Sequence, residues 1–280
     1  MDDGVDRPSP GPAEYVLGST DRELARLEAL SHVYAPVTAA WLDSAGLREG
    51  MSVVDLGCGL GEVTRAVAER VGPTGTVTGV DNAARPLDVA RRRAADGGHG
   101  NVAFEEADVT AWSPREPVDA IIGRLILLHV PDPVAFVARL ARLIRPGGVI
   151  AFQDIVLTTR ATQPPLPLVA TLNGWLVAAF QRLGRPVDMG LRLAAVFAAA
   201  GLPDPVLTAG APLERGAAAV GLSIIAGDAT SLLPAYERTG VATADEVGAE
   251  TVEQRLRDQV DAADAVLVNP LMVGAVTHVD

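Results

Sequence analysis

The 280-residue chain contains no lysine and one cysteine, Cys58. All 23 basic residues are arginines, and 35 acidic residues bring the formal net charge to −12. A single cysteine excludes an intramolecular disulfide and a zinc site built from cysteines. An acidic chain without lysine is a poor partner for nucleic-acid phosphates, and no basic stripe with interleaved aromatic residues appears. We therefore expect no nucleic-acid partner.

Long apolar runs are missing as well. The opening residues MDDGVDRPSPGP are acidic and interrupted by prolines, so we expect a flexible segment over 1–13 and no secretion signal. The longest uncharged stretch, 161–181, contains three prolines and several amides, which argues against a membrane span. These absences predict a cytoplasmic protein without a membrane partner. No spacing of histidines and carboxylates is typical of a metal site, so no metal is expected.

The apolar residues of the sequence alternate between the spacing of strands and the spacing of helices. Apolar strands are predicted over 51–56, 76–80, 102–107, 118–122 and 149–153, and helical spacing fills the intervals between most of them. Such alternation predicts βαβ units and a parallel sheet covered on both faces. Two more strands, 205–209 and 271–279, bring the expected sheet to seven. The predicted fold is α/β, with a Rossmann-like, doubly wound, mainly parallel sheet.

Five regions are expected along the chain. The flexible residues 1–13 precede an N-terminal helical lid, 14–50, made of two helices over 21–34 and 36–45. Residues 51–154 form the core, in which a Pro-Gly-Gly sequence at 146–148 is expected to end a helix. Residues 155–240 form a helical cap with one strand. Residues 241–280 complete the core with a helix, begun by the capping box of Thr243 and Glu246, and a strand.

A glycine turn follows the first strand in the sequence VVDLGCGLGE, residues 53–62. Glycines allow positive φ and a close approach of backbone to ligand, and open α/β sheets bind ligands at this edge. Dinucleotide sites favour G-x-G-x-x-G, but Glu62 stands at the last glycine position and would repel a pyrophosphate. Asp55 also favours a cationic ligand. Asp81 and Asp108 end the next two strands, where they are placed to reach ribose hydroxyls and an adenine amino group.

With these motifs the chain resembles the class I S-adenosylmethionine-dependent methyltransferases over about 15–154. The matching stretches are VVDLGCGLG, VTGVD, EEADV, VDAIIGRLILLHVPDP and LARLIRPGGVIAFQD. The resemblance implies S-adenosylmethionine as the cofactor. It further implies these contacts: Gly57 and Gly59 along the methionine part, Asp81 at the ribose, Asn82 and Val109 beside the adenine, Arg124 and Ile126 beneath the sulfonium, and Tyr15 closing over the cofactor.

Methyl transfer needs an aligned nucleophile, and it needs a base only when the acceptor must lose a proton. His129, after the fourth strand, is the candidate base; the alternative is a structural histidine bonded to backbone. Between Asp154 and Arg182 the only charge is Arg160, so the cap predicts a pocket for a small, largely apolar acceptor. His32, Trp175 and Phe180 are its candidate contacts. The same apolar helices could instead pack on one another or on a second copy, so a homodimer stays open.

The sequence therefore predicts a methyltransferase of a secondary-metabolism type, acting on an oxygen, nitrogen or carbon of a small acceptor. Two other functions remain open at this point. The chain could bind S-adenosylmethionine as a sensor without catalysis, or it could be a nicotinamide-dependent oxidoreductase, since both cofactor classes place a carboxylate at the end of the second strand.

Overall fold

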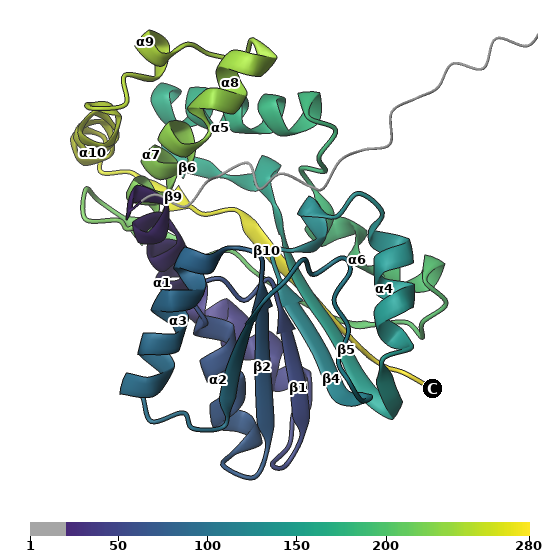
Figure 1. The fold of residues 1–280 in the computed structure, drawn as a ribbon. Helices are drawn as coiled ribbons and strands as arrows, with labels where there is room; N and C mark the ends of the chain where they lie inside the picture. Colours follow the sequence, from purple (N-terminus) through teal and green to yellow (C-terminus); the bar gives the residue numbers. More distant parts are fainter. Residues whose placement is uncertain (1–20) are drawn as a thin grey trace, which may run out of the picture.

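A seven-stranded sheet forms the centre of the computed structural model, which describes residues 21–280 (Figure 1). The strand order is β3-β2-β1-β4-β5-β10-β7. The strands are β1 (Ser52–Leu56), β2 (Thr76–Asp81), β3 (Val102–Glu106), β4 (Val118–Arg124), β5 (Ile144–Val156), β7 (Val206–Gly210) and β10 (Leu271–His278). Strands β1 to β5 are parallel, and β10 runs antiparallel to both β5 and β7. The predicted mainly parallel sheet of seven strands is confirmed.

Helices cover both faces of this sheet, because the central strands are apolar on both sides. Helices α1 (Asp21–Ser44) and α2 (Glu62–Val71) share a core with Ala120 and Ile122 of β4. Helices α4 (Pro133–Ala141) and α6 (Met189–Ala199) share the other core with Ile121. Helix α3 (Ala84–Asp96) contacts β3. Figure 1 shows the two groups of helices on opposite sides of the strands.

The prediction of two N-terminal helices is wrong, because α1 is one helix that contains Pro36. A proline inside a helix removes one backbone hydrogen bond and usually kinks or ends the helix. Here packing on both sides of the proline outweighs that loss. Tyr34 precedes it and Trp41 and Leu42 follow it, and all three side chains are buried.

The Pro-Gly-Gly sequence at 146–148 does not end a helix, since α4 already ends at Ala141. It lies inside β5 and forms an irregularity: Val118 of β4 pairs with Ile144, and Ala120 pairs with Val149. A Cβ on Gly148 would lie 2.6 Å from the carbonyl oxygen of Asp119. This position therefore requires glycine for close approach of two backbones.

The C-terminal helix is also interrupted. Thr243 and Glu246 form the predicted capping box, but α9 (Ala244–Val247) ends at Gly248 and α10 (Val252–Ala262) follows. A small antiparallel sheet was not predicted; it has the order β6-β9-β8, with β6 (Ala161–Gln163), β8 (Leu213–Arg215) and β9 (Val266–Val268). Strands of three residues offer too little alternation to be recognised in a sequence.

Helices lie over the carboxyl ends of the central strands, at the top of Figure 1. Three of them contact one another, and we call these the cap helices: α5 (Pro167–Arg182), α7 (Gly221–Ser231) and α8 (Leu233–Thr239). The single-turn helices η1 (Leu127–His129) and η2 (Leu157–Thr159) follow β4 and β5. Helix α1 packs against α7 and so joins the sheet to the cap helices. Within residues 21–280, no helix has both the length and the apolar character needed to cross a membrane.

Candidate functional site

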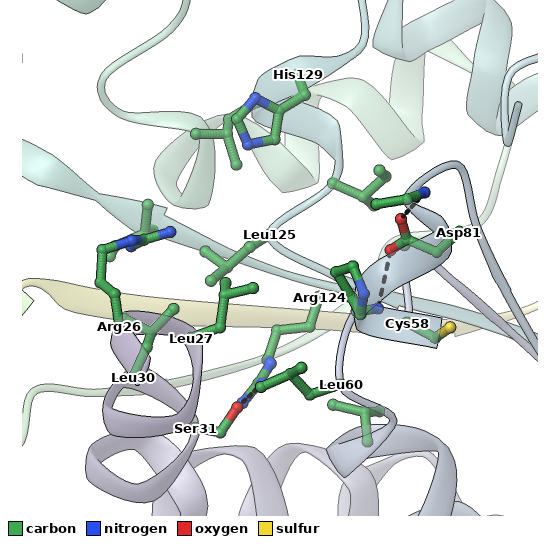
Figure 2. A pocket seen from close by; sticks show the side chains of 18 of the residues that line it. Arg26, Leu27, Leu30, Ser31, Cys58, Leu60, Asp81, Arg124, Leu125 and His129 are labelled. Carbon is green, nitrogen blue, oxygen red and sulfur yellow. Dashed lines mark hydrogen bonds between the residues drawn. The ribbon is translucent and has the colours of Figure 1, made fainter. Parts of the chain in front are cut away.

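A cavity of about 350 Å³ lies between the carboxyl ends of the strands and the cap helices. This volume falls within the usual range of small-molecule sites, about 300–1,000 Å³. The glycine turn after β1 and the ends of β2 and β4 line one part of the cavity, and side chains of α5 and α7 line another. In Figure 2, Arg26 and Leu27 of α1 stand on the opposite side from Asp81, and His129 lies above them.

The three glycines of the turn after β1 have positive φ, 69° at Gly57, 51° at Gly59 and 73° at Gly61. A Cβ added at Gly57 would lie 2.9 Å from Cδ1 of Ile126, and one at Gly61 would lie 3.0 Å from Cβ of Ala90. A Cβ at Gly59 would meet no atom within 4 Å. The backbone at Gly59 therefore borders open space beside the cavity, whereas the flanking glycines pack against protein.

Asp81, at the end of β2, holds this turn in place. Its Oδ2 accepts a hydrogen bond from the backbone N–H of Gly59 at 2.8 Å, and its Oδ1 accepts one from Ala83 at 3.0 Å. Burial raises the pKa of Asp81. A carboxylate has about four acceptor sites, so both oxygens keep capacity for a ligand that donates two hydroxyl groups.

Asp55 lines the same cavity from the end of β1 but is only 1% exposed. Its Oδ2 accepts a hydrogen bond from Oγ1 of Thr64 at 2.6 Å. Burial raises the pKa of Asp55 to about 7. The carboxyl group is therefore partly protonated at neutral pH, and as a counter-ion for a cationic ligand it is weaker than the sequence suggested.

The other predicted cofactor contacts also line the cavity: Asn82, Asp108, Val109, Arg124 and Ile126. Oδ1 of Asp108 accepts hydrogen bonds from the backbone N–H and hydroxyl of Thr110, so Asp108 organises a turn after β3. Tyr15 lies outside the described residues.

The segment after β4 connects the cavity to α1. Arg124 donates to Oγ of Ser31 at 2.9 Å, as Figure 2 shows, and to Oγ1 of Thr38 at 3.3 Å. Leu125, the next residue, has φ 58°, which is uncommon for a side chain of its size. Its N–H donates to the carbonyl of Gln153 at 2.8 Å, which fixes the turn. No pattern in the sequence indicated this strained residue.

His129 ends η1 and is half-buried at the wall of the cavity. Burial, together with the positive charges of Arg185 and Arg26, lowers the pKa of His129 to about 4. Its imidazole is therefore neutral at physiological pH, and the same surroundings make it a weaker base than an ordinary histidine. Asp154 holds the η1 turn, because its Oδ2 accepts a hydrogen bond from the N–H of Leu128 at 3.2 Å. Burial raises the pKa of Asp154 to about 7.

Of the three predicted acceptor contacts, Phe180 lines the cavity, but His32 and Trp175 do not. His32 is exposed on α1, and Trp175 packs against the apolar core. Their sequence neighbours Ser31 and Leu176 line the cavity instead. Successive side chains of a helix point about 100° apart. A sequence can place a helix beside the cavity, but without the rotation of the helix about its axis it does not identify which side chain enters the cavity.

Sequence reasoning missed several polar residues of the cavity wall, namely Arg26, Arg160, Arg185, Asp228 and Asn269. Arg26 of α1 bonds Asp228 of α7, which is 202 positions away. No local pattern connects such residues. The isolation of Arg160 in an otherwise uncharged stretch was the one available signal.

Comparison with known proteins decides the family. A family model described as a methyltransferase domain matches residues 47–180, from just before β1 to nearly the end of α5. Residues 47–180 belong to the class I S-adenosylmethionine-dependent methyltransferases. The cofactor of this methyltransferase domain is S-adenosylmethionine, as the glycine turn and the acidic strand ends predicted.

Several curated methyltransferases are similar to the chain. The ubiquinone biosynthesis O-methyltransferase of Paracidovorax citrulli is 34% identical over 132 residues, which cover 46% of this chain and 54% of that protein. The nocamycin O-methyltransferase of Saccharothrix syringae is 34% identical over 156 residues, covering 55% and 51%. The trans-aconitate 2-methyltransferase of an Azoarcus species is 39% identical over 107 residues, covering 38% and 40%. The matches thus span about half the length of these relatives.

Solved structures support the fold of the methyltransferase domain. A candidate methyltransferase from Bacillus halodurans superposes with a TM-score of 0.55 at 17% identity, covering 86% of this chain and 97% of that one. The YcgJ protein of Bacillus subtilis gives a TM-score of 0.53 at 18% identity, covering 87% and 98%. At such identities the likeness concerns the fold alone.

Proposed function

We propose that this chain transfers the methyl group of S-adenosylmethionine to a small acceptor with an apolar body. One observation carries the proposal: the open backbone face at Gly59 and the carboxylate of Asp81 line the same cavity as apolar side chains of the cap helices. The glycine turn would hold the cofactor, and the residues between 155 and 240 would hold the acceptor.

The residues at the strand ends suit this cofactor chemically. Asp81 has acceptor capacity for two ribose hydroxyls, and Gly59 leaves room for close approach of the methionine part. Asn82 and Val109 would flank the adenine, with Asp108 near its amino group. The acidic side chains that line this end, Glu62, Asp81 and Asp108, outnumber its one arginine, Arg124, and this excess favours a sulfonium and disfavours a phosphate.

The other end of the cavity suits an apolar acceptor. Its wall includes Leu128, Leu157, Leu176, Phe180, Ile224 and Leu232. Bound S-adenosylmethionine supplies a methyl group activated by its sulfonium. The remaining task of the protein is to align the acceptor atom and exclude water, and such alignment can lower a barrier by about 7–11 kcal/mol. Rigid walls from two helices and two strand ends favour that role.

His129 is the group we propose as the base for a hydroxyl acceptor. It lines the cavity and its imidazole is neutral at physiological pH, although a pKa of about 4 makes it a weaker base than an ordinary histidine. The names of two curated relatives, both O-methyltransferases, support an oxygen acceptor. Arg124 and Ile126 would lie at the sulfonium end, where Ile126 also packs against Gly57.

The proposal is tested by calorimetry with S-adenosylhomocysteine on Asp81→Asn and on a matched control, Asp119→Asn. Both carboxylates accept a backbone N–H, from Gly59 and from Ser52 respectively, but Asp119 lies outside the cavity. Loss of charge-assisted bonds to the ribose should cost about 2–3 kcal/mol in Asp81→Asn, close to a hundredfold in affinity. Asp119→Asn should bind as the native chain does.

No binding heat from the native, folded chain would refute the proposal, and so would equal affinities in the two variants. Methyl transfer itself is checked with isotopically labelled S-adenosylmethionine and a panel of phenols, hydroxy acids and amines.

A further inference from the structure

The end of the cavity beneath the cap helices contains more positive than negative charge. Three arginines line it, Arg26, Arg160 and Arg185, and we call them the arginine end. They come from α1, from the residue after η2, and from the segment between α5 and α6. The carboxylate that lines this end with them is Asp228 of α7. These side chains take no part in the proposed cofactor contacts.

Arg26 and Arg160 share the negative charge of Asp228. Nη1 of Arg26 lies 3.1 Å from its Oδ1, and Nη2 of Arg160 lies 3.1 Å from its Oδ2. Arg26 also forms a two-bond pair with Glu23, at 2.8 and 2.7 Å. The Arg160 side chain is 3% exposed, yet its Nε has no hydrogen-bond partner in the part of the chain that the structure describes. A buried donor without a partner is costly unless a ligand satisfies it.

Arg185 is the uncompensated charge of the arginine end. It donates Nη1 to the backbone carbonyl of His129, and within residues 21–280 it forms no ion pair. Among the residues that the structure describes, these three arginines and the two carboxylates paired with them, Glu23 and Asp228, carry a net charge of +1. The same positive charges act on His129, since those of Arg185 and Arg26 both lower its pKa.

We propose that the acceptor carries a carboxylate, which Arg185 binds with Nε of Arg160 as a further donor. The inference rests on the proposed function, because it names the acceptor class of that same cavity. A guanidinium binds a carboxylate through two parallel hydrogen bonds, and one such anion would neutralise the arginine end. The apolar body of the acceptor would then lie against Leu176 and Phe180.

The test compares acids with their uncharged amides of nearly equal shape. Cinnamate and cinnamamide, 4-hydroxybenzoate and its amide, and octanoate and octanamide are titrated into the native chain saturated with S-adenosylhomocysteine. We expect at least one acid to bind about tenfold or more tightly than its amide, as expected for a charge-assisted pair. Calorimetry or ligand-observed NMR measures both affinities without turnover.

Arg185→Gln should abolish the preference for the acid while S-adenosylhomocysteine binds with native affinity. Arg185→Lys retains the charge and should retain part of the preference. The matched control is Arg182→Gln: Arg182 also donates Nη1 to a backbone carbonyl, that of Thr239, but does not line the cavity. Its preference should equal that of the native chain. Thermal melting of each variant in the absence of ligand establishes that it is folded.

Three results would overturn the inference. The native chain binds no acid more tightly than its amide, or Arg185→Gln keeps the preference, or Arg185→Gln weakens S-adenosylhomocysteine. The last result would assign Arg185 to the carboxylate of the cofactor. Failure of the proposed function looks different, because the native chain would then not bind S-adenosylhomocysteine at all.

Discussion

Alanine substitutions at two glycines of the same turn separate a ligand contact from a folding requirement. Gly59 and Gly61 both have positive φ, 51° and 73°. Alanine with a positive φ of this size should lower the free energy of unfolding by about 1–2 kcal/mol at either position. The surroundings differ: a Cβ at Gly59 meets no atom within 4 Å, whereas a Cβ at Gly61 lies 3.0 Å from both Cβ of Ala90 and Cζ of Phe104.

The two variants should therefore fail in different ways. Gly59→Ala should lower the free energy of unfolding by only the cost of the positive φ, about 1–2 kcal/mol. Its new methyl group, however, enters the space in which we place the cofactor. We expect S-adenosylhomocysteine to bind about tenfold or more weakly, a change of at least about 1.4 kcal/mol. Gly61→Ala adds steric overlap of about 1–3 kcal/mol to the same conformational cost, so it should be the less stable protein. Its cofactor affinity, measured below its melting temperature, should stay near the native value.

Thermal melting without ligand and calorimetry with S-adenosylhomocysteine give the two quantities independently. The order of stability should be native, then Gly59→Ala, then Gly61→Ala, whereas the order of affinity should place Gly59→Ala last. If Gly59→Ala binds S-adenosylhomocysteine as tightly as the native chain does, the cofactor does not approach the backbone at Gly59, and the assignment of this turn is wrong.

Two further predictions concern the wall beside the acceptor. His129→Ala should slow methyl transfer to a hydroxyl acceptor about a hundredfold while S-adenosylhomocysteine affinity is kept, whereas a lower melting temperature with a native rate would indicate a structural histidine. Asp154→Asn should flatten the pH dependence of stability. The pKa of Asp154 in the folded chain, about 7, exceeds its ordinary value of 3.8. Between these two pH values the folded chain therefore binds more protons than the unfolded chain, and it loses stability as the pH rises through them. Denaturant titrations at about pH 4.5 and pH 7 measure this slope, and an unchanged slope in Asp154→Asn would contradict the raised pKa.

Sequence reasoning predicted the sheet well because the central strands are apolar and most of them are bounded by turn residues. It failed where packing decides against local preference. Pro36 predicts a helix end, yet the burial of Trp41 and Tyr34 on either side of it keeps α1 continuous. The Pro-Gly-Gly sequence at 146–148 predicts a helix end, but it lies inside β5, where Gly148 allows the close approach of the strand to the carbonyl of Asp119. Both errors arise because the contacts that decide these structures join residues far apart in the sequence, which a short stretch of sequence does not contain.

The two ends of the cavity differ in how far a sequence can describe them. Cofactor residues follow successive parallel strands, so their meeting at one sheet edge follows from the topology itself. Asp55, Asp81 and Asp108 all line the cavity as predicted. The residues that we propose as acceptor contacts come from α1, α5 and α7, and their rotation about each helix axis depends on packing. This is why the cavity is lined by Phe180 but not by Trp175.

Opposite charges at the two ends would also orient the two ligands in the proposed complex. At the strand ends the cavity is lined by the acidic Glu62, Asp81 and Asp108 and by one arginine, Arg124, whereas the described residues of the arginine end carry a net charge of +1. A sulfonium at the arginine end and a carboxylate beside Asp81 would each meet a charge of its own sign. Because like charges in a cavity of low dielectric repel strongly, only one arrangement of donor and acceptor avoids both repulsions. In that arrangement the arginine end holds the anionic group of the acceptor, and the reactive atom of the acceptor points toward the methyl donor. The charges that would select the acceptor would therefore also align it for the reaction.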